Sequence, residues 1–172
     1  MNKVIAVLGL MLILGLMNWS IVVKEQHLSK GQIVKLKLAP VDPRSLMQGD
    51  YMALRFELAD AIYEALSKME SSELWGADAE STHSFVVVKL DQQSVASFVG
   101  LDTEQVLQPD QLKLYYRVRD GKIKFATNAF FFAEGAAELY NAAEYGEFRV
   151  NAEGEVLLSA MLDKDLHKLG PD

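Results

Sequence analysis

An unbroken run of 20 uncharged and mostly apolar residues, positions 4–23, constrains this chain more than any other feature. As an α-helix that rises ~1.5 Å per residue, a run of this length crosses the ~30 Å hydrocarbon core of a bilayer. Trp19 lies near its outer end, where an indole ring favours the membrane–water interface. We therefore predict that residues 4–23 form a transmembrane anchor in contact with the lipid bilayer.

A cleaved signal peptide and a buried core helix are the alternatives to an anchor. A signal peptide has a short apolar core and a cleavage site of small residues. This run is long, and its last residues, 18–23, contain no Ala-x-Ala site. Buried helices of soluble cores rarely run so long without a polar face. The sequence therefore favours an uncleaved signal anchor.

Two lysines flank the run and bear on its orientation. Lys3 and the free amino terminus precede it, and Lys24 follows it directly. Positive charge favours the cytoplasmic side of a span. Because the two lysines nearly balance, the charges favour a cytoplasmic N-terminus, residues 1–3, by only a small margin.

The charge and residue content of the remaining chain exclude several function classes. Residues 24–172 hold 16 of the 17 Lys and Arg residues and all 24 Asp and Glu residues, so their formal net charge is −8. An acidic domain repels phosphate backbones, so we predict no nucleic-acid partner. The chain has no cysteine, and His27, His83 and His167 show no metal-ligand spacing. We therefore predict no metal and no cofactor.

Apolar periodicity after the anchor predicts a mainly antiparallel α+β domain, residues 32–164, between a polar connector, 24–31, and a C-terminal tail, 165–172. Strands are predicted at 32–38, 50–58, 85–90, 95–101, 112–119, 123–127, 148–150 and 156–162, and helices at 58–69 and 134–144. This pattern of about eight strands and two helices is dominated by hairpins and is compatible with a small barrel.

Local signals mark the ends of these elements. Asp120-Gly121 lies between two alternating runs and predicts a tight hairpin turn. Glu64 and Lys68 are four residues apart and predict an ion pair on the outer side of the first helix. Gly146 follows the second predicted helix and is expected to cap it.

Residues 49–56 read Gly-Asp-Tyr-Met-Ala-Leu-Arg-Phe and resemble the motif of the bacterial GDYXXLXY family. Gly49, Asp50, Tyr51 and Leu54 match the motif, and Phe56 stands where the family name has Tyr. Three further segments, 38–46, 126–132 and 138–146, look similar to the same family. The resemblance therefore runs from the anchor to near residue 162.

The resemblance implies a small membrane-anchored protein of unassigned biochemical function, encoded beside multi-pass membrane proteins. It implies a bacterial inner membrane, a periplasmic or extracellular domain, and a multi-pass membrane protein as partner. It supplies no catalytic residue. The Phe at position 56 lacks the tyrosine hydroxyl, so a chemical role for that hydroxyl would be lost here, whereas a packing role would survive.

The motif has a structural and a functional interpretation. Alternation directs Leu54 and Phe56 into the core, while Gly49 and Asp50 suit a turn that enters a central strand. This structural interpretation is favoured. The functional alternative is an exposed binding patch made of Asp42, Arg44, Asp50 and Tyr51.

Three classes of function remain open. The favoured one is an accessory interaction module, in which hairpin edges or the Tyr51 face dock another membrane protein. A Ser/Lys hydrolase would use Ser45 as nucleophile and a desolvated Lys89 as base, although Ser45 lies closer to Gly-Asp than in membrane-anchored signal peptidases. A small barrel that holds an apolar ligand is the third class.

Strand alternation also predicts which way an aromatic run and a basic face point. Phe130, Phe131 and Phe132 are consecutive, and successive strand residues face opposite ways, so at least one must meet a second layer or a partner. The face that carries Tyr115, Arg117 and Arg119 is expected to be solvated.

Overall fold

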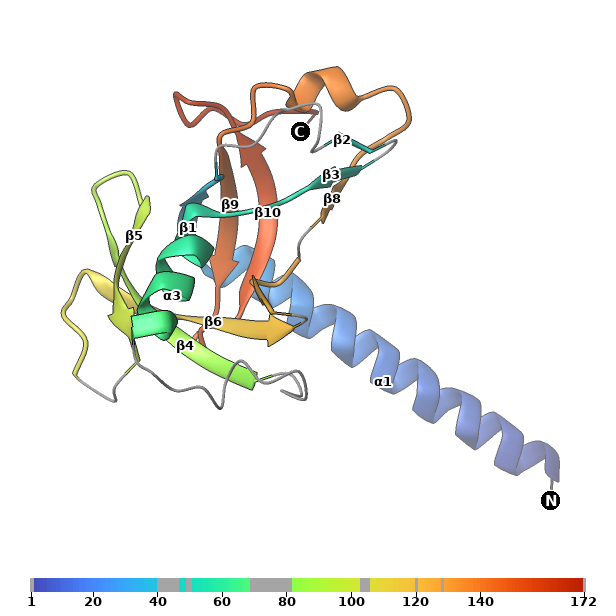
Figure 1. Ribbon diagram of the computed structural model, residues 1–172. Coiled ribbons are helices and arrows are strands. Elements are labelled where there is room, and N and C mark those ends of the chain that lie inside the picture. Colours follow the sequence, from blue (N-terminus) through green and yellow to red (C-terminus); the bar gives the residue numbers. More distant parts are fainter. Residues whose placement is uncertain are drawn as a thin grey trace.

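The computed structural model describes residues 2–39, 47–48, 51–68, 82–102, 106–119, 121–127 and 129–171. In this part of the chain, a long N-terminal helix leads into three small sheets, and one further α-helix packs against them (Figure 1). All strand pairs within the sheets are antiparallel. The predicted α+β class with mainly antiparallel strands is therefore confirmed.

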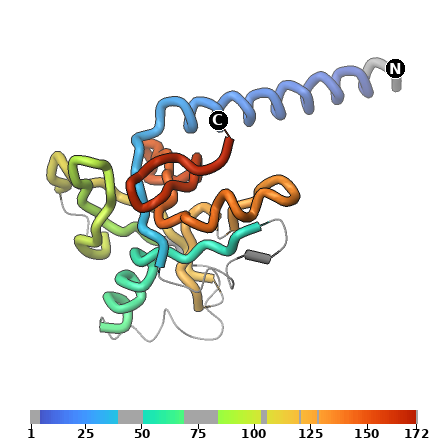
Figure 2. The backbone as a smooth tube through the Cα atoms, turned by 90° about the horizontal axis from the view of Figure 1, so that it is seen from above, coloured from blue at the N-terminus to red at the C-terminus, as the bar shows by residue number. Residues whose placement is uncertain are grey.

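Helix α1 (Asn2–Lys30) projects from the β domain, and its N-terminus lies at the far end (Figures 1 and 2). The segment Ile5–Lys30 has a mean hydropathy of 2.2 in its most apolar window, and none of that window is buried. The helix is thus long and apolar enough to cross a membrane, as an anchor or a signal sequence. The predicted connector is helical up to Lys30, because α1 continues without a break.

Two of the sheets curve around a shared core and form a half-barrel. One has the order β1-β9-β10, with β1 (Gln32–Lys37), β9 (Tyr145–Val150) and β10 (Val156–Leu162). The other has the order β5-β4-β6-β7, with β4 (Thr82–Leu90), β5 (Ala96–Leu101), β6 (Gln111–Arg119) and β7 (Lys122–Lys124). A bridge between Lys35 and Val95 joins them on one side, and the Tyr115 N–H donates to the Gly154 carbonyl at 2.8 Å on the other.

The third sheet has the order β2-β3-β8 and contains the motif strand. Its members are β2 (Met47–Gln48), β3 (Tyr51–Ala53) and β8 (Ala129–Phe131). Of the strand predicted at 50–58, the described residues form a ladder only over Tyr51–Ala53, and α3 (Glu57–Lys68) takes up its last two positions. Met52, Leu54 and Phe56 are nevertheless all buried, since an extended chain alternates its side chains even where no ladder forms.

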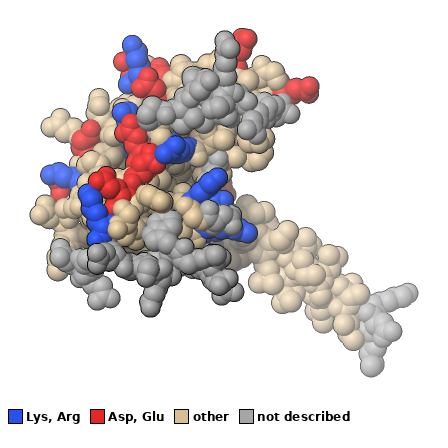
Figure 3. All heavy atoms as spheres, in the orientation of Figure 1, with Lys and Arg blue, Asp and Glu red and all other residues tan. Residues whose placement is uncertain are grey.

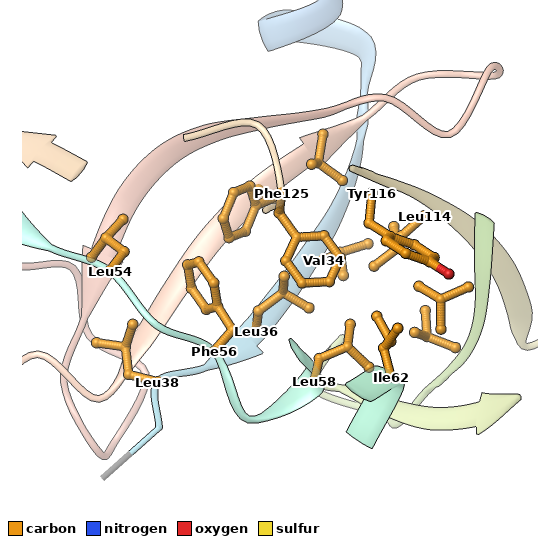
Figure 4. Close-up of a cluster of buried hydrophobic side chains, with 14 of the residues drawn as sticks. Val34, Leu36, Leu38, Leu54, Phe56, Leu58, Ile62, Leu114, Tyr116 and Phe125 are labelled. Atoms are coloured by element: carbon orange, nitrogen blue, oxygen red, sulfur yellow. The ribbon is translucent and has the colours of Figure 1, made fainter. Parts of the chain in front are cut away.

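The core joins residues from all three sheets and from α3. Figure 4 shows Phe56 of the motif segment among side chains that include Leu36, Ile62 and Phe125. The predicted helix over 58–69 is confirmed, and it buries Leu58, Ile62 and Leu66. These three positions follow the spacing of one helical face.

The prediction of a second helix at 134–144 is wrong. The structure has only one 3₁₀ turn there, η2 (Ala137–Tyr140). Gly135 has a φ of +78°, which interrupts a right-handed helix in its first turn. Tyr140 instead packs on Phe130 and Phe132, with ring centroids 4.9 and 5.4 Å away. Gly146 is therefore no helix cap, and it lies within β9.

The predicted hairpins and the helix ion pair are confirmed. Arg119 and Lys122 lie opposite each other, which leaves a two-residue turn, and Gly121 in that turn has a φ of +66°. Lys68 Nζ lies 2.6 Å from Glu64 Oε1 on α3. Beyond β10 the chain folds back, and the Leu169 N–H donates to the Met161 carbonyl at 2.8 Å.

Candidate functional site

The buried side of the motif segment serves packing. Leu54 and Phe56 are 6% and 3% exposed. The Phe56 ring meets the rings of Phe125 and Phe148 edge-on, with centroids 6.1 and 5.4 Å away. Since these neighbours are aromatic rings, a phenylalanine fills the site without a hydroxyl. The last motif position therefore stabilises the core in this chain.

The motif strand and its neighbour β8 together carry two adjacent aromatic rings. Tyr51 of β3 lies directly opposite Phe131 of β8, and the ring centroids are 5.7 Å apart. Phe131 is 73% exposed, whereas Phe130 and Phe132 pack on Tyr140. The run of three phenylalanines thus covers the core with two rings and presents the third to the outside. We call Tyr51 and Phe131 the aromatic pair.

A groove of about 580 Å³ runs beside the motif strand. Its lining includes Ala53 and Arg55 of the motif segment, and Lys122 and Ile123 of the β6–β7 hairpin. Arg55 Nη2 donates to Asp60 Oδ1 at 2.7 Å and so spans the start of α3. Since this ion pair is exposed, it positions Arg55 at the groove mouth and adds little stability.

Most polar residues of the predicted binding patch lie outside the described residues. These are Asp42, Arg44 and Asp50, together with Gly49 of the motif. Tyr51 is the member of that patch within the described part of the chain, and it belongs to the aromatic pair. The patch as a whole stays a prediction.

The surroundings of Lys89 do not suit the predicted Ser/Lys hydrolase. Ser45 lies outside the described residues. Lys89 Nζ forms an ion pair with Asp110 Oδ2 at 3.0 Å, and its side chain is 54% exposed. A lysine base needs a desolvated site without a neutralising carboxylate. Lys89 therefore lacks the surroundings that this chemistry requires.

Sequence reasoning missed a cluster near the C-terminus. The ligand atoms of Asp163, Asp165 and His167 lie within 4.8 Å of one another. Asp163 Oδ1 accepts the backbone N–H groups of Asp165 and His167, at 2.9 and 2.8 Å. The hydrogen bond from His167 is the main reason that the pKa of Asp163 is lowered. The D-x-D-x-H spacing was the available signal, and its hydrogen bonds explain it as a turn.

The junction between α1 and the domain is a second feature that the sequence did not indicate. His27 is 8% exposed, and its Nε2 donates to the Arg149 carbonyl at 2.8 Å. Gly31 approaches β9 so closely that a Cβ there would lie 2.9 Å from Arg149 Cβ. Lys24 Nζ lies 3.9 Å from Glu155 Oε2 in the β9–β10 turn. The last turn of α1 is therefore fixed to the sheet.

Comparison with known proteins identifies a family. A protein-family model described as GDYXXLXY protein matches residues 13–161. The match takes in the C-terminal part of α1, the motif strand, β8 and most of the β9–β10 hairpin. Comparison with curated proteins and with solved structures found no match.

Proposed function

This chain belongs to the GDYXXLXY family, and from that premise we propose that it is a membrane-anchored docking protein. In this proposal, α1 stays uncleaved in a bacterial inner membrane with its N-terminus in the cytoplasm. The domain lies on the periplasmic or extracellular side. Its aromatic pair binds a multi-pass membrane protein of the same membrane.

The observation that carries the proposal is the exposure of Phe131 beside Tyr51. Single exposed apolar side chains are common on monomers and need no explanation. Here two aromatic rings are adjacent, and they project from two short paired strands that also hold the family motif. Aromatic residues are enriched in protein interfaces, where they supply large contact areas at low entropic cost. A partner side chain or strand that covers Phe131 is therefore the favoured occupant.

The groove beside the motif enlarges this surface. It combines apolar side chains such as Ile123 and Phe125 with the charged groups of Arg55 and Asp60. A partner segment that reaches from Phe131 into the groove would gain apolar burial and a place for a polar anchor. Such a mixture of an apolar centre and charged margin is typical of non-obligate interfaces.

The junction at His27 supports an uncleaved anchor. Cleavage near residue 23 would cut α1 in the middle, because the helix continues to Lys30 and its last turn is bonded to β9. An uncleaved anchor confines the domain to the membrane surface. Confinement raises the effective concentration of a partner in the same membrane, so a modest docking surface suffices.

Co-purification tests the proposal. The full chain is isolated at native expression from native membranes in mild detergent, with crosslinking and mass spectrometry. We expect a multi-pass membrane protein to accompany the wild-type chain and to be lost with Phe131→Ser. Val99→Ser is the matched control, since Val99 is also an exposed apolar strand residue, on β5. A wild-type chain that is a strictly lone monomer would contradict the proposal.

A further inference from the structure

Four basic side chains share the outer face of the β6–β7 hairpin. Arg117 lies opposite Lys124, and Arg119 lies opposite Lys122. Directly opposite residues share a face of a sheet, and so do residues two apart on one strand. Val118 and Ile123 occupy the other face, and Val118 is buried. The hairpin therefore presents a two-by-two array of cations, which we call the basic array.

The basic array lacks acidic partners among the described residues. Arg117, Arg119, Lys122 and Lys124 make no ion pair with any residue in the described part of the chain. Nearby on the same strand, Lys113 does have one, with its Nζ 2.7 Å from Asp102 Oδ2. Like charges directly opposite in a sheet repel each other. Because no carboxylate of the described residues pairs with these four cations, an anion bound from outside would relieve their repulsion.

The position of the basic array suggests where that anion lies. In the view of Figure 1, β6 ends and turns into β7 on the side of the domain toward which α1 projects. Figure 3 shows, in the same view, basic side chains on this side of the domain, while the described part of α1 that projects from it is uncharged. The domain as a whole carries a formal charge of −8, so this local excess of positive charge is distinctive.

We propose that the basic array binds the anionic phospholipid headgroups of the membrane that α1 crosses. The proposal rests on α1 being an uncleaved anchor, but not on the aromatic pair. A basic residue near an anionic surface contributes attraction that decays within a Debye length, ~8–10 Å at physiological salt. Because α1 is fixed to β9 at His27, the array is a second attachment point. Two attachment points set the tilt of the domain over the membrane.

The absence of cysteine allows a clean distance measurement. Ala126 is exposed and lies two residues after Lys124, so Ala126→Cys gives a single labelling site beside the array. The full chain with a donor dye at this site is placed in nanodiscs that contain an acceptor-labelled lipid. Nanodiscs of phosphatidylcholine alone are compared with nanodiscs that also contain phosphatidylglycerol. We expect higher energy transfer with phosphatidylglycerol, and we expect high salt to abolish the difference.

Two variants that lose the same charge distinguish an effect of the basic array from an effect of net charge. Arg119→Gln with Lys122→Gln removes two cations of the array, and Lys68→Gln with Lys164→Gln removes two exposed cations elsewhere. In the array variant, the equilibrium constant for contact between the array and the lipid should fall by about fivefold for each cation removed. The control variant should behave as the wild type. Arg119→Lys keeps the charge and should keep the response, which excludes a folding defect as the cause.

The results of this experiment also distinguish a failure of lipid binding from a failure of docking or of the anchor. Energy transfer that is independent of phosphatidylglycerol, or that falls equally in both charge variants, would overturn lipid binding by the array. The nanodiscs contain no partner protein, so this result is unaffected if docking at the aromatic pair fails. A chain that does not insert into nanodiscs at all would instead overturn the anchor on which both proposals rest.

Discussion

Phe56 and Gly146 pack so closely that a Cβ on Gly146 would lie 3.2 Å from Phe56 Cε1. The same Cβ would lie 3.1 Å from Phe148 Cε2 and 3.2 Å from Leu158 Cδ1. The aromatic residue that ends the family motif thus fills a space that β9 leaves free by having no side chain at Gly146. This contact explains why the motif segment and the β9–β10 hairpin belong to one core.

Gly146→Ala should destabilise the domain by about 1–3 kcal/mol, because overpacking forces several side chains out of place. The free energy of unfolding of the full chain in detergent, measured with denaturant, tests this expectation. Gly100→Ala is the control, since Gly100 is also in a strand and a Cβ there would meet nothing within 4 Å. Equal stability of the two variants would contradict the close packing at Gly146.

Replacing a buried phenylalanine and replacing an exposed one should change the free energy of unfolding by very different amounts. Phe56→Ala removes a ring that is 3% exposed and should cost about 3–5 kcal/mol of unfolding free energy. Phe131→Ala removes a ring that is 73% exposed and should change stability by less than about 1 kcal/mol. Thermal unfolding followed by circular dichroism compares them. A large loss for Phe131→Ala would mean that this ring supports the fold rather than a partner.

Much of the fold follows from local periodicity. The spacing of Leu58, Ile62 and Leu66 gave the buried face of α3, and alternation gave the burial of Leu54 and Phe56. These predictions succeeded because a helix or an extended segment fixes its own inward face. The hairpin turn at Gly121 was equally local, since only a positive φ closes a two-residue turn of this type.

What periodicity did not show depends on which side chains pack together. The connector at 24–31 is helical up to Lys30, and His27 within it bonds to Arg149, which is 122 residues away. The expected helix at 134–144 was lost because Tyr140 packs on Phe130 and Phe132 instead. Phe130 and Phe132 lie ten and eight residues before Tyr140, but periodicity within that window does not show which rings pack together.

The candidate site was predictable only in part. Alternation indicated that one ring among the three consecutive phenylalanines points outward. The register of β3 with β8, in which Tyr51 meets Phe131, decides which ring it is. Likewise, the sequence placed Arg117 and Arg119 on one solvated face. Only the pairing with β7 adds Lys122 and Lys124 to that face.

Gly31→Ala should loosen the attachment of α1 to the sheet. A Cβ at this position would lie 2.6 Å from the His27 carbonyl oxygen, so backbone must move. Hydrogen exchange of the full chain in detergent should become faster over the last turn of α1 and the adjacent part of β9. Gly15→Ala is the control within α1, since a Cβ there meets nothing within 4 Å. Unchanged exchange in Gly31→Ala would contradict a fixed junction.

Asp163 should make stability depend on pH in the acid range. Hydrogen bonds from the backbone of His167 and Asp165 lower its pKa in the folded state. Its contribution is therefore fully present above the carboxyl's ordinary pKa and is lost as the pH falls through the lowered folded value. Asp163→Asn keeps an oxygen acceptor for the turn but cannot titrate. Unfolding curves from neutral to acid pH should fall less steeply for this variant, whereas identical slopes would contradict the role of Asp163.

Site-specific photocrosslinking in native membranes tests the docking surface most directly. A photoreactive phenylalanine analogue replaces Phe131 in one full-length chain and Val106, which is 97% exposed, in another. We expect position 131 to crosslink to one multi-pass membrane protein and position 106 not to do so. No crosslink from position 131, or the same products from both positions, would contradict docking at the aromatic pair.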